Sequence, residues 1–140
     1  MIPEIIEMYK KITKGSCAIA LAGAHAKGVS DQHSDLDYYL LVEDVLPYDE
    51  RMALVLEVAD KDAPYYMTPD FDQTCYGGVI DFYYKGTPVE TTVHTMARVK
   101  QRVQDSIDGK FDIYPETWTI GGYYSYIYLS ELDLYQICHR

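Results

Sequence analysis

Two aspartates at the start of an apolar strand constrain the fold of this chain more than any other feature. Asp35 and Asp37 flank Leu36, and they are followed directly by the apolar run 38–42 (YYLLV). Because side chains alternate along a strand, both carboxylates lie on one face and Leu36 points to the other. Carboxylates held this close repel each other unless a divalent cation lies between them. The pattern therefore predicts a metal site.

A glycine turn precedes these aspartates at a short distance. The short buried strand predicted at 17–22 stops at Gly23, and residues 23–34 are small and polar. This composition predicts a turn or a short helical hook. The strand predicted at 36–43 is apolar enough to lie centrally in a sheet. Together these segments predict a phosphate-binding loop beside the metal site.

The rest of the chain predicts helices packed against a small sheet, which is an α/β or α+β fold. Two strand-like runs joined by Lys85-Gly86 predict a hairpin. The length of the chain, 140 residues, predicts a single domain that covers residues 1–140. Apolar spacing predicts helices at 2–14, at 49–60, at 95–108 and from about Pro115 towards the C-terminus. Gly15 and Gly109 are the expected stops of the first and third of these helices. The two strands of the predicted hairpin are 79–84 and 87–94.

Composition narrows the class of partner. The formal charge of -10 argues against tight binding of duplex nucleic acid, which needs a basic surface. No apolar run approaches the roughly 20 residues that span a bilayer, so we expect no membrane segment and a cytoplasmic location. Three scattered cysteines predict reduced thiols, and most of the 15 tyrosines are expected to line a pocket or an interface.

The spacing of the glycine turn and the aspartates resembles the signature of the DNA polymerase β-type nucleotidyltransferase superfamily. Gly23-Ala24 is followed by ten residues and then by Asp35-Leu36-Asp37. The resemblance covers residues 17–43, with a plausible continuation at 79–94. It implies a nucleotidyltransferase-like fold, Mg²⁺ as the cofactor, and a nucleotide-binding loop with Gly23, Ala24, Lys27 and Ser34. Ala24 stands where the family usually has Ser or Gly, and losing that hydrogen bond would weaken nucleotide binding by about 1–2 kcal/mol.

The same resemblance calls for a third carboxylate on a later strand. Glu90, just after the predicted hairpin turn, is the preferred candidate, and Asp81 on the preceding strand is the alternative. The resemblance implies two-metal catalysis, in which Asp35, Asp37 and Glu90 would hold two Mg²⁺ ions and act as the catalytic residues, with the third acid available as a general base. His94 follows Glu90 by four residues, which makes it a further candidate near the acceptor.

The resemblance implies transfer of a nucleoside monophosphate from a nucleoside triphosphate, with ATP as the expected donor, to an acceptor hydroxyl. The expected acceptor is a small molecule of the aminoglycoside or lincosamide kind. One alternative is a minimal nucleotidyltransferase antitoxin that adds AMP to a tyrosine of a helical partner protein. The other, suggested by Ala24, is a non-catalytic binding module. The C-terminal sequence LYQICHR has no helix stop, so we expect either a further helical part outside this chain or packing against a helical partner or a second copy.

Overall fold

The computed structural model describes residues 2–31, 34–71, 77–115, 120–127, 129 and 136–139 of the chain. Four helices and eight strands are described within these ranges. In chain order they are α1 (Pro3–Ile12), β1 (Thr13–Leu21), α2 (Gly23–Ala26), β2 (Leu36–Val45), α3 (Tyr48–Val58), β3 (Tyr66–Met67), β4 (Gly78–Tyr84), β5 (Thr87–Thr95), α4 (Met96–Ile107), β6 (Ile113–Tyr114), β7 (Tyr123–Tyr124) and β8 (Gln136–His139).

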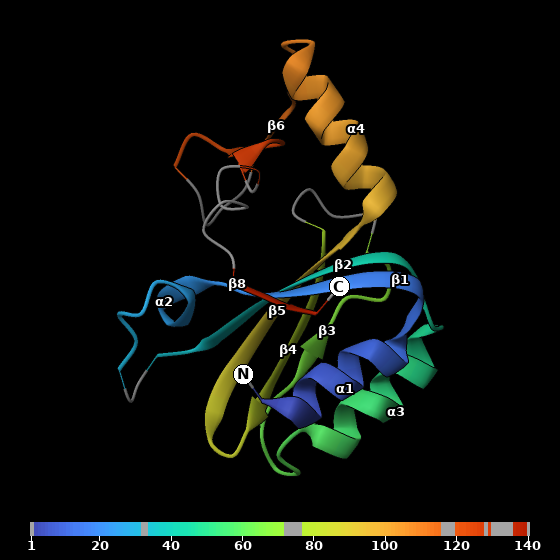
Figure 1. Ribbon diagram of the computed structural model, residues 1–140, viewed down its shortest axis with the longest axis vertical. Helices are drawn as coiled ribbons and strands as arrows, with labels where there is room; N and C mark the ends of the chain where they lie inside the picture. Colours follow the sequence, from blue (N-terminus) through green and yellow to red (C-terminus); the bar gives the residue numbers. More distant parts are fainter. Residues whose placement is uncertain are drawn as a thin grey trace.

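A mixed sheet of six strands forms the centre of the molecule (Figure 1). Its strand order is β3-β4-β5-β2-β1-β8. Strands β2 and β5 are parallel, and every other neighbouring pair is antiparallel. The predicted α/β class with a small mixed sheet is confirmed. Strand β2 lies inside the sheet, as its apolar sequence indicated.

Helices α1 and α3 lie side by side against one face of the sheet and enclose the core (Figure 1). Helix α1 buries Ile5, Tyr9 and Ile12 completely, because its apolar residues recur at helical spacing. The Tyr9 hydroxyl is hydrogen-bonded to the hydroxyl of Thr91 on β5. Since strand side chains alternate, Asp37, Glu90 and other residues between the core positions belong to the opposite face.

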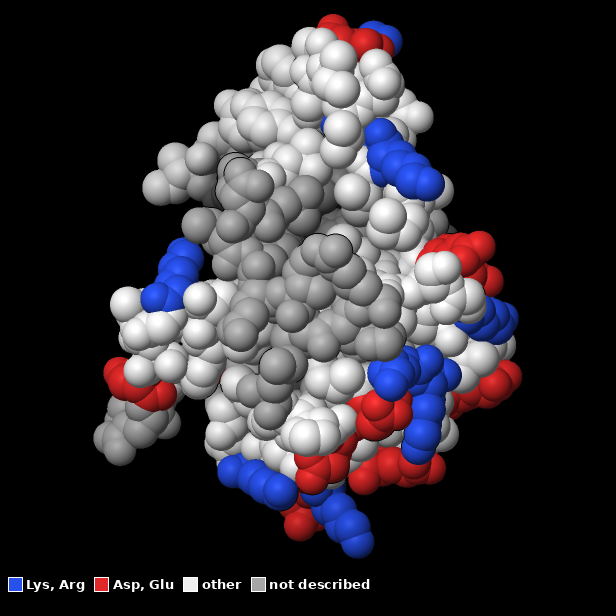
Figure 2. Space-filling view, viewed as in Figure 1, with Lys and Arg blue, Asp and Glu red and all other residues white. Residues whose placement is uncertain are grey.

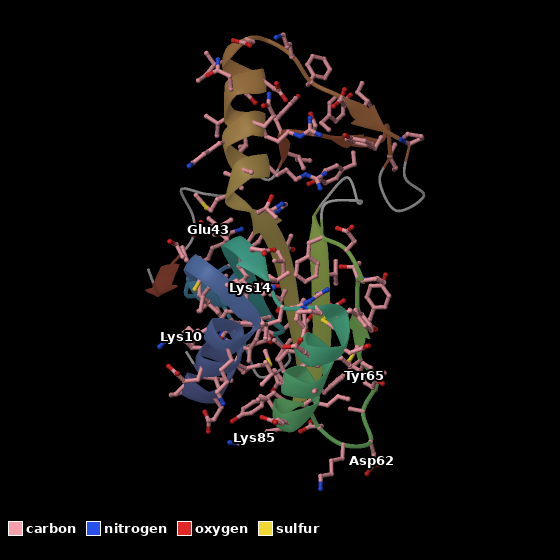
Figure 3. The ribbon with its side chains drawn as sticks, turned by 90° about the vertical axis from the view of Figure 1, so that its right-hand side faces the viewer. Lys10, Lys14, Glu43, Asp62, Tyr65 and Lys85 are labelled. Carbon is pink, nitrogen blue, oxygen red and sulfur yellow. The ribbon has the colours of Figure 1, made fainter. Side chains whose placement is uncertain are left out.

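The first helix is shorter than predicted, because it ends at Ile12 rather than at Gly15. Strand β1 begins directly at Thr13, and Gly15 lies in a β-bulge between Lys14 and Cys17 with a φ of +73°. The N–H of Ser16 donates to the Glu43 carboxylate at 3.1 Å. Figure 3 labels Lys14 and Glu43 near this bulge. Gly15 therefore permits a left-handed residue in a strand, where we had predicted a helix stop.

The predicted hairpin is confirmed as β4 and β5. Its two turn residues, Lys85 and Gly86, have φ angles of +50° and +81°, as a tight two-residue hairpin turn requires. Pro88 pairs with Tyr83 near the end of the ladder, where one missing donor costs little. Helix α4 then follows as predicted, and the Thr95 side chain caps it by accepting from the N–H of Arg98 at 3.3 Å.

The prediction of a helix from about Pro115 onward is wrong, because the residues that the structure describes there form strands and turns. Strand β6 pairs with β7, which contains Tyr123 and Tyr124, and β8 adds a strand beside β1. Gly121 and Gly122 have φ angles of +86° and +89°, which a helix cannot contain. A Cβ at Gly122 would lie 2.8 Å from the Tyr114 carbonyl oxygen. The glycines therefore turn the chain back on itself, and Tyr128 lies outside the described residues.

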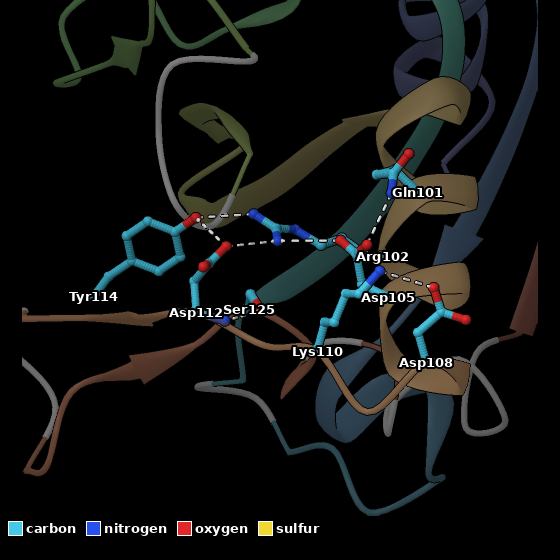
Figure 4. Close-up of polar contacts among 8 residues, drawn as sticks. All are labelled: Gln101, Arg102, Asp105, Asp108, Lys110, Asp112, Tyr114 and Ser125. Carbon is cyan, nitrogen blue, oxygen red and sulfur yellow. Dashed lines mark hydrogen bonds and ion pairs between the residues drawn. The ribbon is translucent and has the colours of Figure 1, made fainter.

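Polar contacts tie this small β6–β7 ladder to α4 (Figure 4). The Arg102 guanidinium contacts the Asp112 carboxylate at 3.0 Å and donates to the Tyr114 hydroxyl at 2.8 Å. The N–H of Asp112 donates to the Ser125 hydroxyl at 3.0 Å, and the N–H of Ser125 donates to the Asp112 carbonyl at 3.0 Å. These bonds join segments that no local sequence pattern relates.

Charged side chains of both signs are mixed on the face shown in Figure 2. Among the described residues drawn there, Lys and Arg lie scattered, and several of them adjoin Asp or Glu. Within the described ranges, no helix has the length and apolar character needed to cross a membrane.

Candidate active site

Three acidic residues lie in register on neighbouring strands of the sheet. Asp37 on β2 is paired with Glu90 on β5, and Glu90 is paired with Asp81 on β4. Residues opposite each other on adjacent strands project to the same face, with strands about 4.8 Å apart. This acidic row (Asp37, Glu90 and Asp81) therefore lies on the sheet face opposite α1 and α3. Both candidates for the third carboxylate, Glu90 and Asp81, are neighbours in it.

The glycine turn lies directly against the first member of the acidic row. The N–H of Ala22 donates to the Asp37 carbonyl at 2.8 Å, which holds the end of β1 beside β2. Gly23 has a φ of +60°, and a Cβ at this position would lie 1.7 Å from Asp37 Oδ2. Any side chain here would displace the carboxylate. Gly23, Asp37 and Glu90 are thus the predicted site residues that the structure brings together.

The structure places the other predicted site residues just before β2 and in or just after α2. Asp35 is half-buried immediately before β2, and alternation places it on the face of Asp37. Ala24 lies in the four-residue helix α2, and Lys27 is exposed just after it. The Ser34 hydroxyl donates to Asp31 Oδ1 at 3.0 Å and accepts from the Asp31 N–H at 2.9 Å. That hydroxyl therefore closes a turn in the loop instead of pointing free towards a ligand.

Burial shifts the pKa of one member of the acidic row, Asp81. Burial raises the pKa of Asp81 to about 6, the N–H of Thr91 lowers this pKa, and the charge of Glu90 raises it further. A raised pKa means that the ionised carboxylate is poorly compensated in the protein alone. A bound positive charge near Asp81 and Glu90 would remove that cost.

The acidic row supplies the oxygen donors that Mg²⁺ prefers. Asp37 and Glu90 are the directly paired carboxylates, and Asp35 precedes Asp37 on the same face. Within the described part of the chain, no three Asp, Glu, His or Cys side chains are grouped closely enough to hold a metal ion by themselves. Carboxylate oxygens are the right donor type for Mg²⁺, and its remaining ligands would have to come from outside this pair, for example from phosphate oxygens.

His94 does not occupy a place from which it could meet an acceptor. Its side chain is 0 % exposed and stacks on Tyr39 with the ring centroids 6.3 Å apart. Burial lowers its pKa to about 4, and the nearby charge of Arg98 lowers it further. A neutral histidine held inside the protein is a structural residue, and the role considered from its spacing to Glu90 is not supported.

A groove beside the acidic row was not predicted from the sequence. Its volume is about 230 Å³, and we call it the tyrosine groove. Tyr65 and Tyr66 are 51 % and 56 % exposed, and Tyr66 pairs with Asp81 across the sheet edge. The residues that line it are Pro64, Tyr65, Tyr66, Asp81, Phe82, Tyr83, Pro88, Val89 and Glu90. The signal available in the sequence was the high tyrosine content, but it could not tell which tyrosines line a pocket.

Comparison of the chain with protein-family models finds no match, and comparison with curated proteins finds no significant match either.

Proposed function

We propose that this chain is a Mg²⁺-dependent nucleotidyltransferase. It would move a nucleoside monophosphate from a nucleoside triphosphate, with ATP as the expected donor, to an acceptor hydroxyl. The observation that carries the proposal is the pairing of Asp37 with Glu90 on neighbouring parallel strands, with Gly23 pressed against Asp37. This arrangement combines a sharp glycine loop with two carboxylates on one face of a sheet. It supports the site expected from the spacing of Gly23, Asp35 and Asp37.

The proposed reaction is an in-line displacement at the α-phosphorus. The acceptor hydroxyl oxygen attacks phosphorus and forms a phosphate ester, while the bond to the bridging oxygen breaks and pyrophosphate leaves with its electron pair. Glu90, the exposed member of the pair, is assigned to accept the hydroxyl proton. Mg²⁺, when held by Asp35, Asp37 and Glu90, supplies positive charge that offsets the negative charge on the phosphate oxygens. Lys27 is exposed and offers a further positive charge for the outer phosphates.

The acceptor in this proposal is a small hydroxyl compound of the aminoglycoside or lincosamide kind. The alternative of a non-catalytic module depends on Ala24, which lacks the hydroxyl that would bond a phosphate oxygen. Backbone N–H groups of the loop remain available to a phosphate at this position. We therefore expect Ala24 to weaken nucleotide binding rather than to abolish it.

Transfer from ATP labelled at the α-phosphate tests the proposal. Mg²⁺ and a panel of aminoglycosides and lincosamides are added, and both acceptor labelling and pyrophosphate release are measured. Asp37→Asn should lower transfer by about 100-fold or more, because it removes a metal ligand. Its melting temperature should not fall, since the substitution also removes a source of charge repulsion.

The matched control is Asp62→Asn, because Asp62 is an exposed carboxylate in the turn after α3 and is not a member of the acidic row (Figure 3). This variant should transfer at the wild-type rate. Wild-type turnover by Asp37→Asn would refute the assignment of Asp37. Mg²⁺-dependent ATP binding without labelling of any compound in the panel would refute the proposed acceptor class.

A further inference from the structure

The tyrosine groove and the acidic row share two residues, which places a binding surface next to the proposed reaction centre. Asp81 and Glu90 line the groove and are also members of the row. Tyr66 continues the same line of paired positions on the next strand, opposite Asp81. Tyr65 lies beside β3 at the sheet edge, on the side of the molecule away from Lys10 and Lys14 (Figure 3). The groove therefore leads from the edge of the sheet towards Glu90.

The lining of the groove has a definite chemistry. Of the described residues that line it, the charged ones are Asp81 and Glu90, and both are acidic. Three of the others are tyrosines, with Tyr65 and Tyr66 more than half exposed. Tyrosine faces attract cations and pack against the apolar faces of rings, and carboxylates pair with ammonium groups. A positively charged ring compound satisfies both kinds of lining at once.

The volume of the groove limits the size of what it holds. Sites for whole drug-sized ligands measure about 300–1,000 Å³, and the groove measures about 230 Å³. One six-membered ring with its substituents is therefore a better match than a large molecule. The side chain of a tyrosine from a partner protein is neutral, so it would leave the Asp81 carboxylate without a counter-charge.

We propose that the tyrosine groove binds one amine-bearing ring of the acceptor, with the ammonium group beside Asp81, the ring face against Tyr65 and Tyr66, and a hydroxyl directed towards Glu90. This inference rests on the proposed nucleotidyltransferase function, because it identifies the groove as the acceptor side of that site. Asp81 is then a specificity-determining residue, which selects amine-bearing compounds over neutral ones.

Binding of 2-deoxystreptamine, a cyclohexane ring with two amines and three hydroxyls, tests the inference without Mg²⁺ or nucleotide. Its neutral counterpart is scyllo-inositol, and both are titrated calorimetrically at physiological salt. The amine should bind at least about tenfold more tightly than inositol, because only the amine offers a charge to the groove. Asp81→Asn should weaken amine binding by about tenfold or more and leave inositol binding unchanged.

Two tyrosine variants separate the groove from a general effect of surface charge. Tyr65→Ala should weaken amine binding, and Tyr126→Ala should not, although Tyr126 is similarly exposed at 42 % and lies near the distant β6–β7 ladder. Because Tyr65 is half exposed, its truncation is expected to leave the fold intact. Melting curves of all variants confirm that each protein is folded at the temperature of the titration.

Equal binding of the amine and inositol, or amine binding that is unaffected by both Asp81→Asn and Tyr65→Ala, would overturn the inference. Preferential binding of a tyrosine-containing peptide over the amine would also overturn it. Titration of Mg²⁺ and ATP on the same wild-type protein keeps the two proposals apart. If ATP binds and the amine does not, only the groove assignment fails. If the amine binds and ATP does not, the nucleotidyltransferase proposal fails.

Discussion

At the scale of single residues, His94 shows how burial sets the charge state of a side chain. Its imidazole is fully buried and stacked on Tyr39, and its pKa is lowered to about 4 from an ordinary value of 6.5. The unfolded chain therefore binds a proton at this residue between pH 6.5 and pH 4, where the folded chain does not. The resulting contribution to stability is complete above pH 6.5 and is lost as the pH falls towards 4.

This linkage predicts the pH dependence of unfolding. Between pH 7 and pH 4.5, His94 should lower the free energy of unfolding of the wild-type protein by about 2 kcal/mol. In His94→Gln that part of the pH dependence disappears, whatever the variant costs in absolute stability. Urea unfolding of both proteins at the two pH values measures the difference. Parallel pH profiles for wild type and variant would show that His94 does not carry this proton linkage.

At the scale of secondary-structure elements, Asp60 joins the segment after α3 to the β4–β5 hairpin. Its carboxylate accepts from the N–H groups of Lys85 and Gly86, at 2.9 and 2.8 Å. The N–H of Asp60 donates to the Tyr83 carbonyl at 2.8 Å. These bonds satisfy the turn donors of the hairpin that presents Asp81 and Glu90.

Asp60→Ala should therefore lower the free energy of unfolding by about 1–2 kcal/mol, because two charge-assisted hydrogen bonds are lost at a partly exposed site. Asp62→Ala, two residues further on and exposed, should change it by less than about 0.5 kcal/mol. Urea unfolding at pH 7 compares the two variants. A loss of the same size in both would mean that the Asp60 carboxylate does not stabilise the hairpin turn.

Local sequence signals predicted the elements better than they predicted the contacts between them. The apolar run after Asp37 and the Lys85-Gly86 turn are local features, and the corresponding strands and hairpin are confirmed. The parallel pairing of Asp37 with Glu90 depends on residues 53 positions apart and could only be anticipated by resemblance. Near the C-terminus, apolar and tyrosine spacing predicted a helix, but the left-handed glycines at 121 and 122 and the Asp112–Ser125 bonds produce a ladder.

At the scale of the whole molecule, the two faces of the central sheet carry different side chains. Helices α1 and α3 cover one face and bury the core, while the acidic row and part of the tyrosine groove lie on the other. The strand pairing fixes which carboxylates become neighbours. The proposed function requires Asp37 and Glu90 to act together on a magnesium-bound nucleotide.

The joint action of Asp37 and Glu90 is tested by calorimetric titration of ATP with and without Mg²⁺. The titration is made on the wild-type protein and on the variants Asp37→Asn, Glu90→Gln and Asp62→Asn. We expect wild type and Asp62→Asn to bind ATP only when Mg²⁺ is present. Asp37→Asn and Glu90→Gln should bind ATP at least about tenfold more weakly although they remain folded. Wild-type protein that binds no ATP at millimolar Mg²⁺, or variants at Asp37 and Glu90 that bind it unchanged, would refute the proposed function.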